Sequence, residues 1–273
     1  MKNSPKLAMY DFGKTTLNAC QFDLRFSYFT YVPSDYDPEG DQIYNLAVIV
    51  HGTNRPVQEY RDAFIDFAEA NQSIILVPVF PAGIAFPGEL SSYKFIHYDG
   101  IRYDDILFAM MDELAAKYRV RTDKVLMHGF SGGGHFTHRF LYLHPDRLLA
   151  ASIGAPGRIT YLDDTKPWYL GISDFEEKFG VPVRFDLMKQ VPVQMIVGGD
   201  DVEMEEINDT NDPFWMDGMD AYGKTRVERL KALHKNFADH GIEARLDIVP
   251  GVKHEGFKVL EPVKEFFTKS LKK

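Results

Sequence analysis

Short apolar runs alternate with longer amphipathic stretches through most of the chain. Six of the runs have the pattern of buried β-strands, because they are rich in Val, Ile, Leu and Ala and stop at Gly, Pro or His or at a polar turn. They are Leu46–Val50, Ile74–Val79, Lys124–Met127, Leu149–Ile153, Val193–Val197 and Arg245–Val249. Continuous apolar runs of this kind are typical of a parallel sheet covered on both faces.

Apolar residues at spacings of three and four predict amphipathic helices between these strands. The predicted helices are Tyr60–Ala70, Tyr103–Tyr118, a stretch ending at Leu143, Tyr222–His240 closed by Gly241, and Pro262–Leu271. The early segment Asp23–Val32 alternates polar and aromatic residues, which predicts an antiparallel strand, and we place it at the sheet edge. The alternation of strands and helices predicts an α/β fold with a mostly parallel central sheet.

One stretch, Gly157–Gln190, departs from the alternation and is rich in aromatic residues. It is interpreted as a short lid-like insertion or as a long structural loop, and both interpretations stay open. Because no linker or repeat interrupts the chain, we expect residues 1–273 to form a single domain.

Charge and cysteine content narrow the classes of partner. The chain has 31 Lys and Arg against 40 Asp and Glu, a formal net charge of −9, which disfavours binding to nucleic acid or to an anionic membrane. Cys20 is the only cysteine, so neither an internal disulfide nor a cysteine-based metal site is expected. No leader pattern and no membrane-length apolar run is present, and the expected location is therefore cytoplasmic. The sequence does not indicate an oligomeric state.

Candidate chemistry begins at Gly129-Phe130-Ser131-Gly132-Gly133-Gly134, directly after a predicted strand and before a predicted helix. A nucleophilic serine on such a sharp turn needs small neighbours, because its backbone is strained and larger side chains would collide. The turn also directs the backbone N–H of Gly132 toward a point where a negative oxygen can sit. A glycine-rich turn without reactivity is the alternative for the motif taken alone.

A second oxyanion donor is expected in the loop after Leu46–Val50, where His51-Gly52-Thr53 follows the strand. The Thr53 N–H is our choice and Gly52 is the alternate. For His51 we favour a structural role, with its ring hydrogen-bonded to the backbone.

A serine nucleophile needs a histidine base, and the base needs a carboxylate that orients it. Asp200 and Asp201 follow the strand Val193–Val197, and His254 lies in the loop after the last strand, so the order serine, acid, histidine is present. We assign Asp201 as the acid, with Asp200 as the fallback, although a solvated acidic turn explains both. A metal site at His135 and His138 is not favoured, because no third ligand is evident.

These four motifs in this order resemble the α/β-hydrolase superfamily, and within it the polyhydroxybutyrate-depolymerase-like and feruloyl-esterase-like serine esterases. The resemblance implies a Ser131–His254–Asp201 triad, an oxyanion hole from Thr53 and Gly132, and no cofactor. It implies hydrolysis of a small-molecule carboxylic ester.

The substrate is encoded less clearly. Phe80, Trp168 and Trp215 fall in or near loops expected to border the site, which suggests an apolar or aromatic ester. Packing of the lid onto the sheet is the alternative, because aromatic residues are more often part of a core than of a binding site. Arg55 and Arg158 are candidates to hold a substrate carboxylate, with exposed structural arginines as the alternative. An amidase or peptidase, and a non-catalytic binding protein on the same fold, remain the rival functions.

Overall fold

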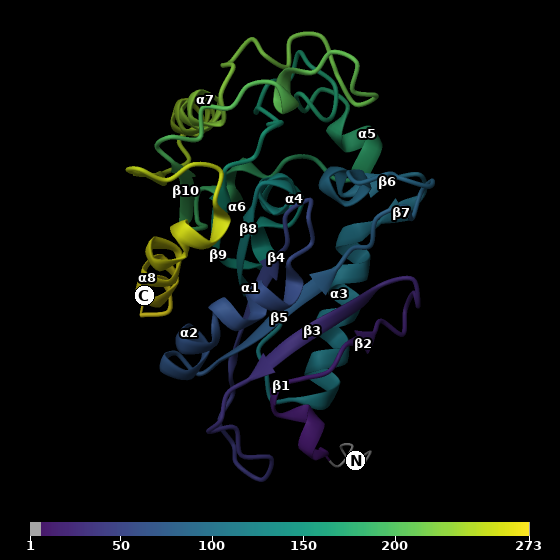
Figure 1. The fold of residues 1–273 in the computed structure, drawn as a ribbon, viewed down its shortest axis with the longest axis vertical. Coiled ribbons are helices and arrows are strands. Elements are labelled where there is room, and N and C mark those ends of the chain that lie inside the picture. The colour runs from purple at the N-terminus through teal and green to yellow at the C-terminus, as the bar shows by residue number, and fades with distance from the viewer. Residues whose placement is uncertain (1–6, 273) are drawn as a thin grey trace.

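One large sheet organises the protein in the computed structural model, which describes residues 7–272. Within these residues nine strands form the sheet in the order β1-β3-β5-β4-β8-β9-β10-β11, with β2 also paired to β3 (Figure 1). Its strands are β1 (Gly13–Lys14), β2 (Asn18–Ala19), β3 (Ser27–Val32), β4 (Asn45–Val50), β5 (Ser73–Val79), β8 (Val125–Phe130), β9 (Leu148–Gly154), β10 (Val193–Gly198) and β11 (Ala244–Val249). A separate pair is formed by β6 (His97–Tyr98) and β7 (Ile101–Arg102).

The six apolar runs of the sequence are the six parallel strands β4, β5, β8, β9, β10 and β11, as predicted. The antiparallel strand predicted within Asp23–Val32 is β3, which pairs with β5. Its expected place at the sheet edge is wrong, because β1 and β2 cover its other side. Strands of two residues are too short to produce a periodic pattern in the sequence.

The helices lie on both faces of the sheet. They are α1 (Val57–Ala63), α2 (Ile65–Ala70), α3 (Tyr103–Lys117), α4 (Gly132–Leu143), α5 (Phe175–Phe179), α6 (Phe185–Met188), α7 (Arg226–Asp239) and α8 (Leu260–Ser270), with 3-10 turns at Met9–Asp11, Ser92–Phe95, Pro145–Arg147, Glu206–Asn208 and Gly256–Val259. Phe67 of α2 packs on Phe267 of α8, while Phe108 of α3 packs on Phe140 of α4. Figure 1 shows α2 and α8 on one side of the sheet and α3 on the other. No helix within residues 7–272 has the length and apolar character needed to cross a bilayer.

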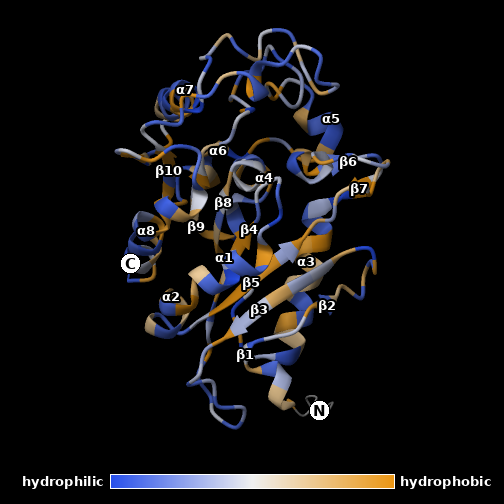
Figure 2. Ribbon diagram, in the orientation of Figure 1, coloured by the Kyte–Doolittle hydropathy of each residue, from blue (hydrophilic) through white to orange (hydrophobic). Residues whose placement is uncertain are grey.

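Residues 157–179 and the loop between β10 and α7 form the upper part of the molecule in Figure 1, where they lie beyond the carboxyl ends of the parallel strands. Residues 157–190 carry the short helices α5 and α6, and α6 lies lower, beside the 3-10 turn Pro145–Arg147 that precedes β9. Trp168, Phe175 and Phe179 pack together there, with ring centroids 4.8–5.6 Å apart, and all three are buried. Figure 2 shows mixed hydropathy over these upper loops and apolar strands in the sheet below. The carboxyl edge of the sheet is therefore covered by a segment with its own small aromatic core.

Candidate active site

Ser131 sits on a sharp turn between β8 and α4. Its backbone has φ 56° and ψ −116°, a conformation that a residue with a side chain rarely adopts. The Ser131 N–H donates to the Gly154 carbonyl of β9 at 2.8 Å, which fixes the turn against the sheet. The hydroxyl is thereby held at the carboxyl end of β8.

The glycines around Ser131 allow the backbone to pack this closely. A Cβ atom on Gly129 would lie 2.3 Å from the Gly133 carbonyl carbon, and one on Gly133 would lie 2.1 Å from the Val50 carbonyl oxygen. Contacts this short with backbone atoms leave no room for a methyl group. The first turn of α4 therefore lies directly against β4, and only glycine permits it.

The two expected oxyanion donors are neighbours in the structure. A Cβ atom on Gly132 would lie 3.1 Å from the Thr53 backbone nitrogen, and Thr53 and Ser131 line the same cavity. Within residues 7–272 the Thr53 N–H finds no hydrogen-bond acceptor. An N–H that is free in this way beside a serine hydroxyl is available to a developing negative oxygen.

His51 has the structural role that its position suggested. Its Nε2 accepts the Phe80 N–H at 3.1 Å, and its Nδ1–H donates to the Gly52 carbonyl at 2.8 Å. The ring is fully buried, and burial lowers its pKa to about 3. A neutral His51 thus ties the loop that carries Thr53 to the end of β5.

Asp201 and His254 come together at the ends of β10 and β11. Asp201 Oδ2 lies 2.6 Å from His254 Nδ1, and Asp201 is fully buried while Asp200 is exposed. The His254 ring packs on the ring of Phe130, with centroids 4.9 Å apart, and Phe130 directly precedes Ser131. The structure therefore pairs the histidine with the second of the two aspartates and places its ring on Phe130, the residue before the serine.

The serine and the histidine are not yet hydrogen-bonded to each other. Within the described residues neither Ser131 Oγ nor His254 Nε2 makes a hydrogen bond, and the hydrogen bond of the His254 ring uses Nδ1. Catalytic hydrogen bonds are often long in unliganded sites and tighten when substrate binds.

Arg226, which the sequence reasoning missed, contacts Asp201 on the side away from His254. It is the first residue of α7 and is buried, with its guanidinium 3.4 Å from Asp201 Oδ1 and 2.9 Å from Glu206 Oε2. A capping box begins this helix: Thr225 Oγ1 accepts the Glu228 N–H at 3.1 Å, and the Glu228 carboxylate accepts the Thr225 N–H. The cap fixes the start of α7 and with it the position of Arg226.

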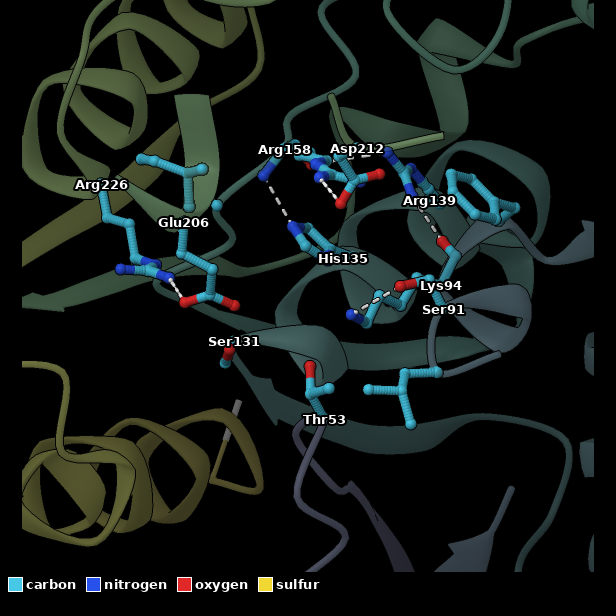
Figure 3. A pocket seen from close by; sticks show the side chains of 14 residues that line it. Thr53, Ser91, Lys94, Ser131, His135, Arg139, Arg158, Glu206, Asp212 and Arg226 are labelled. Atoms are coloured by element: carbon cyan, nitrogen blue, oxygen red, sulfur yellow. Dashed lines mark hydrogen bonds and ion pairs between the residues drawn. The ribbon is translucent and has the colours of Figure 1, made fainter. Parts of the chain in front are cut away.

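A cavity of about 160 Å³ opens beside Ser131 (Figure 3). Most of the side chains that line it are polar or charged. They are Thr53, Leu90, Ser91, Lys94, Phe95, Ser131, His135, Arg139, Gly157, Arg158, Glu206, Ile207, Asp212 and Arg226. The sequence reasoning singled out Arg158 among the four cations but not Lys94, Arg139 or Arg226. Arg139 carried a usable signal, since an arginine followed directly by the apolar run Phe140–Leu143 in a predicted helix needs a polar partner if it is buried.

The aromatic residues expected to bind substrate lie elsewhere, which corrects the apolar pocket expected from them. Phe80 is fully buried and packs on Tyr93 and Phe136 in the core. Trp168 packs within residues 157–190, and Trp215 lies half-buried against the core. None of these three is among the side chains that line the cavity. Aromatic side chains are large and apolar, so packing them in the core removes a large area from water.

The other noted residues have structural partners. His135 Nε2 accepts the Arg158 N–H at 2.6 Å and His138 Nε2 accepts the Thr160 N–H at 3.1 Å, so both rings brace the chain after β9. Among residues 7–272 no group of three or more metal-ligating side chains is found. Arg55 donates to the carbonyls of Thr53 and Phe80 and thereby orders the loop that carries Thr53.

Comparison with known proteins identifies the fold. No family model matches the sequence, and no curated protein matches it in sequence. Solved structures do share its fold. Poly(aspartic acid) hydrolase-1 from Sphingomonas sp. KT-1 has a TM-score of 0.71 at 19% identity, covering 88% of this chain and 92% of its own. The poly(3-hydroxybutyrate) depolymerase LpqC from Bordetella parapertussis has a TM-score of 0.70 at 22% identity, covering 89% of this chain and 84% of its own.

A third solved structure with this fold is an S-formylglutathione hydrolase from Agrobacterium tumefaciens, with a TM-score of 0.61 at 13% identity. It covers 96% of this chain, and 99% of its own length is covered. The protein therefore has the α/β-hydrolase fold, as the sequence motifs predicted.

Proposed function

We propose that the protein is a serine hydrolase that cleaves carboxylic esters through an acyl-enzyme. The observation that carries the proposal is the buried Asp201, 2.6 Å from a His254 ring that packs on Phe130, the residue before the strained Ser131. A carboxylate, an imidazole and a serine in this order are the groups that nucleophilic acyl transfer requires. In this proposal residues 1–273 form one catalytic domain, with residues 157–190 as a cap above the site.

The proposed reaction has two halves. Ser131 Oγ attacks the ester carbonyl while His254 Nε2 accepts its proton, and Asp201 stabilises the resulting imidazolium. The Thr53 and Gly132 N–H groups hold the oxyanion, each contributing about a hundred- to a thousandfold in rate. The carbon–oxygen bond then breaks and His254 passes its proton to the departing alcohol. Water attacks the acyl-enzyme, His254 accepts its proton, and the acid leaves as the Ser131 hydroxyl is restored.

Cavity size and lining limit the substrate. About 160 Å³ is small beside the roughly 300–1,000 Å³ of pockets for drug-sized ligands. Because the lining is charged, we propose a small polar ester as the substrate instead of the apolar or aromatic ester expected from the sequence.

Hydrolysis of an amide is the second candidate. Poly(aspartic acid), which the name of one structural neighbour gives as its substrate, is a polyanionic polyamide, and the cavity beside Ser131 is lined by cations. The same three side chains serve both reactions, because the difference lies in the protonation of the leaving group.

The test is labelling and turnover with a matched variant. We expect a fluorophosphonate to label the wild type but not Ser131→Ala, and methyl and p-nitrophenyl esters to be hydrolysed only by the wild type. A matched amide assayed beside each ester separates the two candidates. Equal turnover by wild type and Ser131→Ala on every ester and amide, with no labelling, would show that the proposal is wrong.

A further inference from the structure

The cavity beside Ser131 is positively charged, although the protein as a whole is acidic. Four cations and two carboxylates line it, while the formal charge of the chain is −9. A recess of one sign with low-dielectric walls concentrates ligands of the opposite sign. The lining therefore favours an anion.

Two of the four cations are paired with carboxylates in the chain. Arg158 lies 2.5 Å from Asp212, and Arg226 contacts Asp201 and Glu206. The charges of these two arginines are thus balanced within the chain, that of Arg158 by Asp212 and that of Arg226 by Glu206 and the proposed acid Asp201.

Lys94 and Arg139 have no carboxylate partner within residues 7–272. Lys94 Nζ donates to Ser91 Oγ at 3.1 Å, and the Arg139 guanidinium donates to Thr160 Oγ1 and to the Lys94 and Arg158 carbonyls. Figure 3 shows both side chains on the same side of the cavity. These hydrogen bonds give the N–H groups of Lys94 and Arg139 acceptors, but the acceptors are neutral and do not balance the two positive charges.

A buried cation without a counter-charge is costly. Arg139 is 1% exposed and lies between the rings of Phe95, Trp168 and Tyr169. Burial lowers the pKa of Arg139 to about 9, and burial together with Arg158 lowers that of Lys94 to about 8. An anionic substrate group beside Lys94 would supply the charge that these two side chains do not find in the chain.

The position of Lys94 indicates that the anionic group belongs to the acyl half of the ester and not to the alcohol half. Lys94 Cε lies 3.0 Å from where a Cβ on Gly132 would be, next to the proposed oxyanion donors. Arg226, which contacts the partner of His254, lies across the cavity from Lys94 in Figure 3. Since His254 protonates the departing alcohol, the alcohol lies on its side and the acyl group extends toward Lys94.

We propose that the acid portion of the substrate carries a second carboxylate, bound by Lys94 in front of Arg139, so that the substrate is a half-ester of a short dicarboxylic acid. This inference rests on the proposed ester hydrolysis. It requires no group beyond the chain, the half-ester and water.

The experiment compares charged and neutral esters of one carbon skeleton. Monomethyl succinate, glutarate and adipate are assayed beside their dimethyl esters, and the ratio of kcat/KM values is the readout. We expect the wild type to prefer one half-ester by roughly ten- to a hundredfold, which is the size of a hydrogen bond to a charged group. Lys94→Met should abolish the preference, Lys94→Arg should retain part of it, and Lys231→Met on the exposed face of α7 should retain all of it.

A binding measurement keeps the two proposals separable. Glutarate should bind to Ser131→Ala by calorimetry, at least tenfold more weakly when Lys94→Met is added. Equal turnover of half-esters and diesters would overturn the carboxylate site while leaving the hydrolase intact. Competition by sulfate as strong as that by glutarate would also overturn it, since the site would then take any anion. Absence of turnover and labelling would reject the hydrolase, and glutarate binding would still decide the carboxylate site.

Discussion

Both carboxylate oxygens of Asp201 are engaged, Oδ2 by His254 Nδ1 at 2.6 Å and Oδ1 by Arg226 at 3.4 Å. A buried carboxylate held from two sides has one orientation, and this orientation fixes which nitrogen of His254 carries the proton. The neighbouring Asp200 is exposed and, among residues 7–272, pairs with neither a histidine nor an arginine. The two adjacent aspartates therefore differ in their surroundings, which predicts that they differ in role.

Exchange of each aspartate for asparagine tests this difference. We expect Asp201→Asn to lower kcat for ester hydrolysis by about a thousand- to ten-thousandfold, because the amide favours the wrong tautomer of His254. Asp200→Asn should stay within about threefold of the wild type, since surface substitutions away from a site have small effects. Steady-state kinetics on one ester decides it, and comparable losses in the two variants would contradict the assignment.

Gly133→Ala should be strongly destabilising. Its Cβ would lie 2.1 Å from the Val50 carbonyl oxygen, so the first turn of α4 would have to move off β4. Forced overpacking costs typically 1–3 kcal/mol, and we expect at least about 3 kcal/mol because the opposing atom belongs to a central strand. Urea unfolding measures this loss in the free energy of unfolding.

Gly40→Ala is the matched control, because its Cβ would meet the nearest atom, Asp37 Cβ, at 3.3 Å in a surface turn. It should change the free energy of unfolding by less than about 1 kcal/mol. Similar losses in the two variants would mean that the close packing around Ser131 is not what makes Gly133 necessary.

Buried histidines should make the protein lose stability below neutral pH. Burial lowers the pKa of His51 to about 3, that of His138 to about 3 and that of His128 to about 4, each from an ordinary value of 6.5. Because the unfolded chain binds these protons and the folded one does not, their stabilising effect is complete above pH 6.5. As the pH falls toward 4, each histidine removes up to about 1.4 kcal/mol per pH unit.

Urea unfolding between about pH 7.5 and 4.5 measures this slope. Carboxylates such as Asp104, whose pKa is lowered from 3.8, lose their contribution only below this window, so they do not obscure it. His128→Asn should reduce the slope of the free energy of unfolding against pH by the contribution of one histidine. A free energy of unfolding that stays constant across the window would contradict the prediction.

The preference for half-esters should weaken at alkaline pH. Burial is the main cause that lowers the pKa of Lys94 to about 8; Arg158 and Arg55 lower it further, while Glu206 and Glu89 raise it. Because kcat/KM reports the free enzyme, the half-ester to diester ratio should fall as pH rises through about 8. Lys94→Arg should hold the ratio constant, since a guanidinium keeps its charge there. A wild-type ratio that is constant to about pH 9.5 would contradict it.

The fold was predictable because its signals are local. Each parallel strand is a continuous apolar run, and Gly129 to Gly134 mark a close approach that only small residues allow. The choice between Asp200 and Asp201 was less secure, because a strand end does not reveal which of two adjacent side chains turns inward. The structure pairs Asp201 with His254 through the path of the loop after β10.

The lining of the cavity was not predictable, because it is assembled from segments far apart in the chain. Lys94 lies in a 3-10 turn after β5, and Arg139 lies two turns into α4. Phe80 and Trp168 were expected to bind substrate because they occupy loops near the site, but both side chains are buried in the core. Loop position alone does not determine the direction of a side chain.

The cap at the start of α7 links a surface position to the proposed reaction centre. Thr225 and Glu228 exchange hydrogen bonds at the helix terminus, and the next residue after Thr225 is the arginine that holds Asp201. Fraying of that single turn would free Arg226 and let the carboxylate rotate while the sheet stays folded. The rate of turnover would then depend on whether this one helix end is folded. Heating should therefore inactivate the protein at a lower temperature than the one at which the whole chain unfolds.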